Sequence, residues 1–227
     1  MNEVPARAPA AEYVPRFYRT AATIVWVVLK LFFRLRVYGR ENVPRNGACI
    51  LAANHASYLD PPILGAAVRF RAVRFLAQAG LFEHRWMNWF LRHALVVPVR
   101  RGHGDVAALR RAIAMLKEGA CLGIFPEGTR TPNGALGEAK GGIGFLVAQA
   151  RAPVIPVFIA GTYRAWPRWR KWPRPGTVSV HIGRPIMPDE IAAYKRDYAA
   201  VAARILAAIA ALEPTHRAQE PSPRASR

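Results

Sequence analysis

The sequence has little cysteine, with only Cys49 and Cys121 among 227 residues. Two thiols are too few for a disulfide framework, and they suit a reducing compartment. Both lie inside apolar runs of strand length, where a buried and inert thiol is the expected state. Apart from His55, the few histidines are scattered without the carboxylate or thiol spacing of a metal site, so we expect no bound metal.

Acidic residues are also scarce. The chain carries 14 Asp and Glu against 33 Lys and Arg, a formal net charge of +19. A surface this basic attracts polyanions, meaning nucleic acid, anionic lipid or phosphorylated substrates, and composition does not choose among them. At 52% hydrophobic residues the chain can bury a sizeable core, which excludes wholesale disorder, and its length favours one domain.

No apolar run is long enough to span a bilayer. The longest covers residues 20–33, and as a helix it measures roughly 21 Å against roughly 30 Å of hydrocarbon. It contains Trp26 and has arginines on both sides, a pattern typical of an interfacial or re-entrant helix. The alternative is a helix packed on the domain's own core. We expect membrane contact, because the segment is apolar all round.

Apolar runs of strand length alternate with helical patterns from Gly47 onward. The expected strands are residues 48–53, 73–77, 95–99, 120–125, 154–160 and 177–182. The expected helices are residues 104–117, 143–150 and 190–212. This alternation predicts an α/β fold, a single domain with a largely parallel central sheet flanked by helices. We therefore divide the chain into an N-terminal arm and membrane-associated helix (1–38), a folded domain (39–212) and a disordered tail (213–227).

The first polar motif follows the strand at 48–53 and reads Asn54-His55-x-Ser57-x-x-Asp60. Ligands of open α/β sheets bind beyond the carboxyl ends of strands, which is where this histidine lies. His55 can act as a general base, and Asp60 can accept its other N–H and stabilise the imidazolium. Asn54 and Ser57 can close the turn with hydrogen bonds. The alternative is a set of ordinary caps around a structural histidine.

A second polar loop follows the strand at 120–125 and contains Glu127, Gly128, Thr129 and Arg130. Glycine lets the backbone approach a ligand closely, and the guanidinium fork of Arg130 suits a phosphate that Thr129 can also bond. The alternative is a polar turn with a surface arginine. Because both loops follow strands of one sheet, we expect them to converge at one edge.

Together, Asn-His-x-Ser-x-x-Asp and Phe-Pro-Glu-Gly-Thr-Arg resemble the motifs of the glycerolipid acyltransferase family, over roughly residues 37–185. Residues 94–100 resemble the family's second motif, whose phosphate-binding arginine would be Arg100. Residues 154–157 resemble its fourth motif. The usual Lys-x-Glu-Leu is replaced by residues 78–81, Gln-Ala-Gly-Leu, and Val99 stands where an aspartate is usual. These departures concern acceptor recognition more than the reaction.

The resemblance implies acyl transfer from acyl-CoA or acyl-carrier protein to the sn-2 hydroxyl of lysophosphatidic acid, giving phosphatidic acid, with no cofactor besides the thioester. The expected location is the cytoplasmic face of the inner membrane. In this interpretation His55 and Asp60 are catalytic. The expected substrate-binding residues are Asn54, Ser57, Arg100, Glu127, Gly128, Thr129 and Arg130. The alternative acceptor is another lysolipid, such as lyso-ornithine lipid. A non-catalytic basic protein that binds membrane or nucleic acid is the competing class.

Residues 164–174 form an aromatic and basic segment in which Trp166, Trp169 and Trp172 recur every third residue among cations. Tryptophan favours the wet edge of a bilayer, and cations are attracted to anionic lipid. We expect these residues, with Trp26, to contact an anionic membrane. Rings packed on the domain, a solvated charged face and nucleic-acid stacking are the alternatives, and we expect no nucleic-acid partner.

Overall fold

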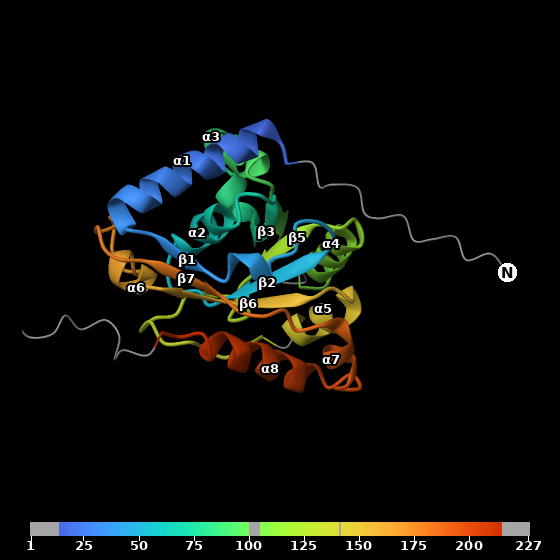
Figure 1. Ribbon diagram of the computed structural model, residues 1–227. Coiled ribbons are helices and arrows are strands. Elements are labelled where there is room, and N and C mark those ends of the chain that lie inside the picture. Colours follow the sequence, from blue (N-terminus) through green and yellow to red (C-terminus); the bar gives the residue numbers. More distant parts are fainter. Residues whose placement is uncertain (1–13, 100–104, 141, 215–227) are drawn as a thin grey trace, which may run out of the picture.

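The computed structural model describes residues 14–99, 105–140 and 142–214, which form three layers (Figure 1). Helices α1 (Arg16–Phe33) and α2 (Asp60–Ala67) cover one face of a central sheet. Helices α4 (Asp105–Lys117), α5 (Gly142–Ala150) and α8 (Tyr198–Ala210) cover the other. The predicted α/β class is confirmed.

The sheet has seven strands in the order β1-β7-β6-β2-β5-β3-β4. Their bounds are β1 Arg36–Tyr38, β2 Cys49–Ala53, β3 Val73–Gln78, β4 Val96–Val99, β5 Cys121–Ile124, β6 Val154–Ala160 and β7 Ser179–Ile182. The strands from β6 to β4 run parallel, whereas β7 runs antiparallel to β6 and β1 runs parallel to β7. Every predicted strand is present. The unpredicted β1, which lies before the expected domain boundary at residue 38, is an edge strand of this sheet.

Side-chain alternation along the central strand β2 divides the core in two. Cys49, Leu51 and Ala53 pack toward α1 and α2, while Ile50 and Ala52 pack toward α4, α5 and α8. All five are fully buried, as expected of a parallel strand covered on both faces. Both cysteines are buried thiols outside any disulfide, so the expectation of buried thiols inside strands is confirmed.

The predicted helix over residues 190–212 is wrong as one continuous element. The chain forms α7 (Pro188–Ala192), breaks, and begins again as α8. Lys195 and Arg196 adopt left-handed φ values of 45° and 74°, which end a right-handed helix. Asp197 then caps α8 by accepting a 2.9 Å hydrogen bond from the Ala200 N–H. The remaining short elements are η1 (Arg40–Asn42), η2 (Ala79–Phe82), α3 (Arg85–His93) and α6 (Thr162–Ala165).

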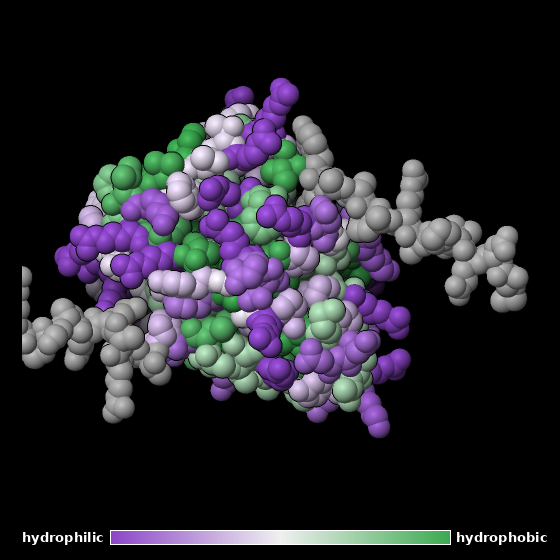
Figure 2. Space-filling model, viewed as in Figure 1, coloured by the Kyte–Doolittle hydropathy of each residue, from purple (hydrophilic) through white to green (hydrophobic). Residues whose placement is uncertain are grey.

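Helix α1 begins four residues before its predicted start. One side of the helix packs on the core, and the other exposes apolar side chains. Its first turn is fixed by Tyr18, whose hydroxyl oxygen accepts from the Val73 N–H at 3.0 Å. Leu29 and Phe33 are buried against the sheet. The outward residues Ile24, Val27, Val28, Leu31 and Phe32 are exposed, and they form the apolar band at the upper left of Figure 2. No helix in the described part of the chain has both the length and the apolar character needed to cross a bilayer.

Candidate active site

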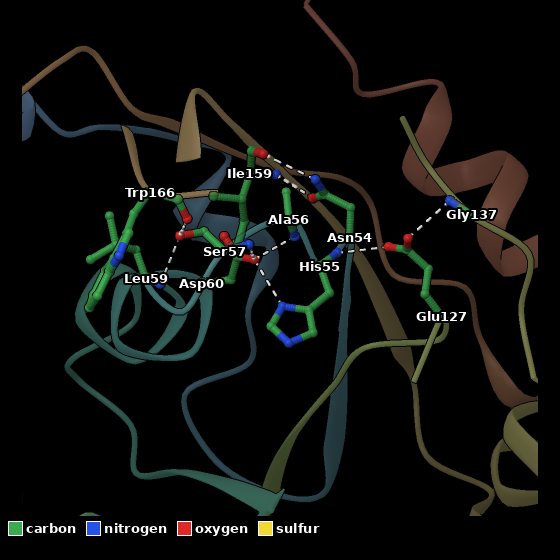
Figure 3. A network of polar contacts seen from close by, with 10 residues as sticks. All are labelled: Asn54, His55, Ala56, Ser57, Leu59, Asp60, Glu127, Gly137, Ile159 and Trp166. Carbon is green, nitrogen blue, oxygen red and sulfur yellow. Dashed lines mark hydrogen bonds and ion pairs between the residues drawn. The ribbon is translucent and has the colours of Figure 1, made fainter. Parts of the chain in front are cut away.

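The two polar loops meet because β2 and β5 are neighbours in the sheet. Ala52 pairs with Ile124, so the two strands end side by side. The His55 N–H donates to Glu127 Oε1 at 2.7 Å, and the Thr131 N–H donates to the His55 carbonyl at 2.8 Å. The predicted convergence of the loops at one sheet edge is confirmed (Figure 3).

His55 and Asp60 form the predicted hydrogen bond, with Nδ1 2.9 Å from Oδ2. Asp60 is fully buried at the first residue of α2, where a helix N-terminus favours negative charge. Its Oδ2 also accepts the N–H groups of Ala56 and Ser57, at 2.7 Å each. These bonds hold the carboxylate in place, and the carboxylate in turn holds the Nδ1–H tautomer of His55.

The other ring nitrogen of His55, Nε2, is the atom available for proton transfer. Nε2 points away from every residue drawn beside it in Figure 3. The imidazole stacks on Phe125 with centroids 4.2 Å apart, and the His55 side chain is 17% exposed. The Nε2 of an Nδ1–H imidazole carries a lone pair that can take a proton from a substrate hydroxyl.

Asn54 and Ser57 brace this loop through their side chains, and the substrate contact predicted for them stays a prediction. The Asn54 amide exchanges two hydrogen bonds with the backbone of Ile159, at 2.7 and 3.1 Å, which ties the loop to β6. The Ser57 hydroxyl donates to the Trp166 carbonyl at 2.7 Å and accepts from the Leu59 N–H at 3.1 Å. Both side chains are buried. The turn-closing role predicted for Ser57 is confirmed.

Glu127 braces the two loops against each other. One carboxylate oxygen accepts from the His55 N–H and the other from the Gly137 N–H, at 2.7 and 2.9 Å. Burial raises the pKa of Glu127 above its ordinary value, and these two backbone N–H bonds oppose the rise. With both oxygens bonded to backbone N–H groups, Glu127 supports the backbone of His55. The predicted contact with substrate stays a prediction.

We expect Glu127→Gln to lower the free energy of unfolding by about 1–3 kcal/mol, because the new amide group turns a donor toward a backbone donor. Folding raises the pKa of Glu127, so protonation of this group stabilises the folded state. That stabilisation is complete below pH 4.5, the ordinary pKa, and is lost as pH rises through the raised pKa of the folded protein. The difference between wild type and Glu127→Gln should therefore shrink with rising pH in denaturant titrations. Glu138→Gln, at an exposed position, is the matched control; equal effects from both variants would contradict the bracing role.

The second loop places a cation beside the catalytic pair. Gly128 has a φ of 64°, and the Lys140 side chain lies so close that an added Cβ would meet its Cδ at 2.8 Å. Thr129 is exposed. The Arg130 guanidinium lies over the Tyr58 ring, and its Nη1 is buried without a hydrogen-bond partner among the described residues. Arg100, the other predicted phosphate ligand, lies outside the described residues.

Sequence reasoning missed two aromatic rings of the site, Phe125 under His55 and Tyr58 under Arg130. Each lies within one of the two motifs, so an aromatic residue close in sequence to a candidate base or cation could have indicated it.

The tryptophans predicted to contact membrane divide into two pairs. Trp26 packs on the core beneath Arg69, whose Cζ is 4.4 Å from the ring centroid. Trp166 also packs on the core, and its indole N–H donates to the Arg170 carbonyl at 2.9 Å. Trp169 and Trp172 are 66% and 70% exposed. The alternative of rings packed on the domain therefore holds for the first pair, and membrane contact stays a prediction for the second.

A protein-family model described as Acyltransferase matches residues 34–160, which is more than half of the chain and includes both loops. The chain therefore belongs to the acyltransferase family and is an enzyme of this class. The resemblance read from the two motifs is confirmed.

Individual relatives show which acyltransferases the chain is similar to. It is 28% identical to 1-acyl-sn-glycerol-3-phosphate acyltransferase of Bacillus subtilis over 77% of this chain and 85% of that one. It is 32% identical to lyso-ornithine lipid O-acyltransferase of Pseudomonas aeruginosa over 68% of this chain, but it spans only 58% of that protein. The crystal structure of the 1-acyl-sn-glycerophosphate acyltransferase PlsC from Thermotoga maritima matches 86% of this chain and 78% of that one, at 30% identity and a TM-score of 0.71.

Proposed function

We propose that the enzyme transfers a fatty acyl group from acyl-CoA or acyl-carrier protein to the sn-2 hydroxyl of lysophosphatidic acid, giving phosphatidic acid. The observation that carries the proposal is the 2.9 Å bond from His55 Nδ1 to buried Asp60, which leaves Nε2 pointing away from the other residues drawn in Figure 3. The named relatives from Bacillus subtilis and Thermotoga maritima support this acceptor.

The reaction needs one base and no cofactor besides the thioester. The acceptor oxygen attacks the thioester carbonyl while His55 Nε2 takes its proton, and Asp60 stabilises the imidazolium that forms. The tetrahedral intermediate then collapses, the carbon–sulfur bond breaks, and the imidazolium returns the proton to the thiolate. The products are an ester and a free thiol. No covalent acyl-enzyme is required.

Arg130 is the residue that we assign to the acceptor's phosphate. The N–H of its neighbour Thr131 donates to the His55 carbonyl, so the backbone at Arg130 runs beside that of the base, and the guanidinium lies over Tyr58 of the same loop as His55. Its buried Nη1 has no partner in the described part of the chain, and a phosphate oxygen would supply one. Arg100 and Thr129 are proposed to complete this phosphate site.

Lyso-ornithine lipid is the second candidate acceptor. The relative from Pseudomonas aeruginosa that bears this name is 32% identical, and residues 78–81 depart from the usual family pattern. An ornithine lipid carries no phosphate, so it would make no use of a phosphate-binding Arg130.

An acceptor panel separates the two candidates. Purified protein is given labelled acyl-CoA or acyl-carrier protein together with lysophosphatidic acid, lyso-ornithine lipid or no acceptor. We expect labelled phosphatidic acid as the main product. Transfer to lyso-ornithine lipid alone would overturn the proposed acceptor, and transfer to neither would count against the proposed function.

We also propose that the enzyme works on an anionic membrane surface, at the cytoplasmic face of the inner membrane. Helix α3 adds to the apolar surface of α1, because its Trp86, Trp89 and Phe90 are exposed. The two helices touch where the ring centroids of Trp89 and of Phe17 in α1 lie 5.3 Å apart. The loop that carries Trp169 and Trp172 adjoins the end of α1, since the Gly176 N–H donates to the Phe32 carbonyl at 3.3 Å. Contiguous exposed apolar surface beside cations suits an anionic bilayer. Two cysteines that form no disulfide fit a reducing location.

Vesicle flotation tests the role of the loop. We expect wild type to bind anionic vesicles more strongly than neutral ones, because each nearby cation adds about 1 kcal/mol of attraction. The double variant Trp169→Ala/Trp172→Ala should weaken binding on the order of tenfold, because it removes two interfacial rings. Met187→Ala, which removes an exposed apolar side chain next to α7, is the control. Equal binding of wild type to both vesicle types, or no loss in the double variant, would contradict the proposal.

A further inference from the structure

Tyr58 lies inside the catalytic loop, but its environment differs from that of its neighbours. Ser57 and Asp60 are fully buried, whereas Tyr58 is 52% exposed. One close neighbour is Arg130, whose Cζ lies 3.4 Å from the ring centroid. Another is Trp166, whose ring centroid lies 5.6 Å away at a 54° tilt. The Tyr58 ring is therefore held by contacts with Arg130 and Trp166 although it is not part of the core.

The contact with Tyr58 is the interaction that orients Arg130. Within the described residues, Arg130 makes no ion pair with a carboxylate, and its buried Nη1 has no hydrogen-bond partner. A guanidinium over an aromatic face is attracted by the ring quadrupole, and this contact uses none of its N–H groups as hydrogen-bond donors. The N–H groups of a guanidinium are the groups that bind phosphate oxygens in a bidentate way.

The ring is also tied to the base. Tyr58 follows His55 by three residues, and the adjacent Ser57 hydroxyl donates to the carbonyl of Trp166, the ring's other neighbour. Hydrogen bonds therefore join the loop on either side of the ring to Asp60 and to Trp166, and Arg130 rests on the ring that this loop carries.

We propose that Tyr58 is a positioning residue that holds Arg130 toward the acceptor's phosphate and so sets the preference for phosphate-bearing lysolipids. The proposal rests on the proposed function, in which Arg130 binds that phosphate. Tyr58 acts through Arg130 and takes no part in proton transfer.

The test is a double-mutant cycle on the full-length enzyme, with lysophosphatidic acid and acyl-CoA as substrates. Tyr58→Leu should raise the KM for lysophosphatidic acid about tenfold and change kcat and the KM for acyl-CoA far less, because the lost interaction concerns acceptor binding. Tyr58→Phe keeps the aromatic face and should restore KM to near the wild-type value. In an Arg130→Gln background, Tyr58→Leu should add little, because the two residues act as one unit.

Three outcomes would overturn the proposal. Additive effects of Tyr58→Leu and Arg130→Gln would show that the two side chains act independently. A Tyr58→Phe variant as impaired as Tyr58→Leu would assign the effect to the hydroxyl. Equal losses in kcat and in both KM values would indicate general damage to the loop. If wild type used only a phosphate-free lysolipid, the proposed acceptor itself would fail, whereas activity on lysophosphatidic acid without coupling would reject Tyr58 alone.

Discussion

Replacing His55 by alanine should lower kcat for acyl transfer by about 10²–10⁴-fold, the usual contribution of a positioned general base. The expected loss follows from the geometry of His55, since the proposed proton acceptor is held by a buried carboxylate. Without it the acceptor hydroxyl attacks unaided. Single-turnover and steady-state assays with lysophosphatidic acid measure the loss directly.

Folding must be separated from chemistry in this variant. The His55 backbone N–H bonds to Glu127 and its carbonyl accepts from Thr131, and both contacts survive truncation of the side chain. We therefore expect a thermal midpoint close to that of wild type. His84→Ala, at an exposed position outside the site, is the matched control and should keep full activity. Substantial acyl transfer by a folded His55→Ala protein would disprove the mechanism.

Asp60→Asn should produce the second largest loss, about 10³–10⁴-fold in kcat, by the same logic that makes the aspartate of serine protease triads essential. The amide has nearly the shape of the carboxylate, but it is neutral and cannot stabilise the imidazolium. If its NH₂ group faces the ring, it also favours the wrong tautomer of His55. Because Asp60 Oδ2 also accepts from Ala56 and Ser57, we expect a fall in the free energy of unfolding of about 1–3 kcal/mol.

The stability loss does not account for the activity loss, and assays below the unfolding transition separate them. Asp189→Asn, an exposed carboxylate near the start of α7, serves as the control and should leave both quantities unchanged. A folded Asp60→Asn enzyme within about tenfold of wild type would contradict the assigned role.

Elements whose signal is local could be predicted well. Six strands follow from apolar runs bounded by turn residues, and the helices over 104–117 and 143–150 lie within two residues of α4 and α5. Gly104 itself lies outside the described residues. The join of α7 and α8 could not be predicted, because apolar residues recur with helical spacing straight through a break. That break depends on two left-handed residues and on the Asp197 cap.

The site shows the same division. Residue types and spacing identified the catalytic pair and the arginine loop, since a base and its orienting carboxylate lie five residues apart on one turn. The turn-closing bond of Ser57 to Leu59 is local and could be predicted. The bracing bonds of Asn54, Ser57 and Glu127 could not, because these partners lie at least ten residues away in sequence, at Ile159, Trp166 and Gly137. Polar side chains in a motif look alike whether they face substrate or backbone.

By itself, the sequence determined the fold class, the family and the His55–Asp60 pair, because each depends on periodicity or on residues close together in the chain. Only the tertiary structure decided which motif residues brace the loops, which tryptophans reach the surface and which ring supports Arg130. Each of these depends on β2, β5 and β6 lying side by side, so that residues roughly 70–110 positions apart share hydrogen bonds. The scarcity of acidic residues follows the same pattern: composition showed an excess of cations, and the fold placed Arg130 over Tyr58 without a carboxylate partner among the described residues.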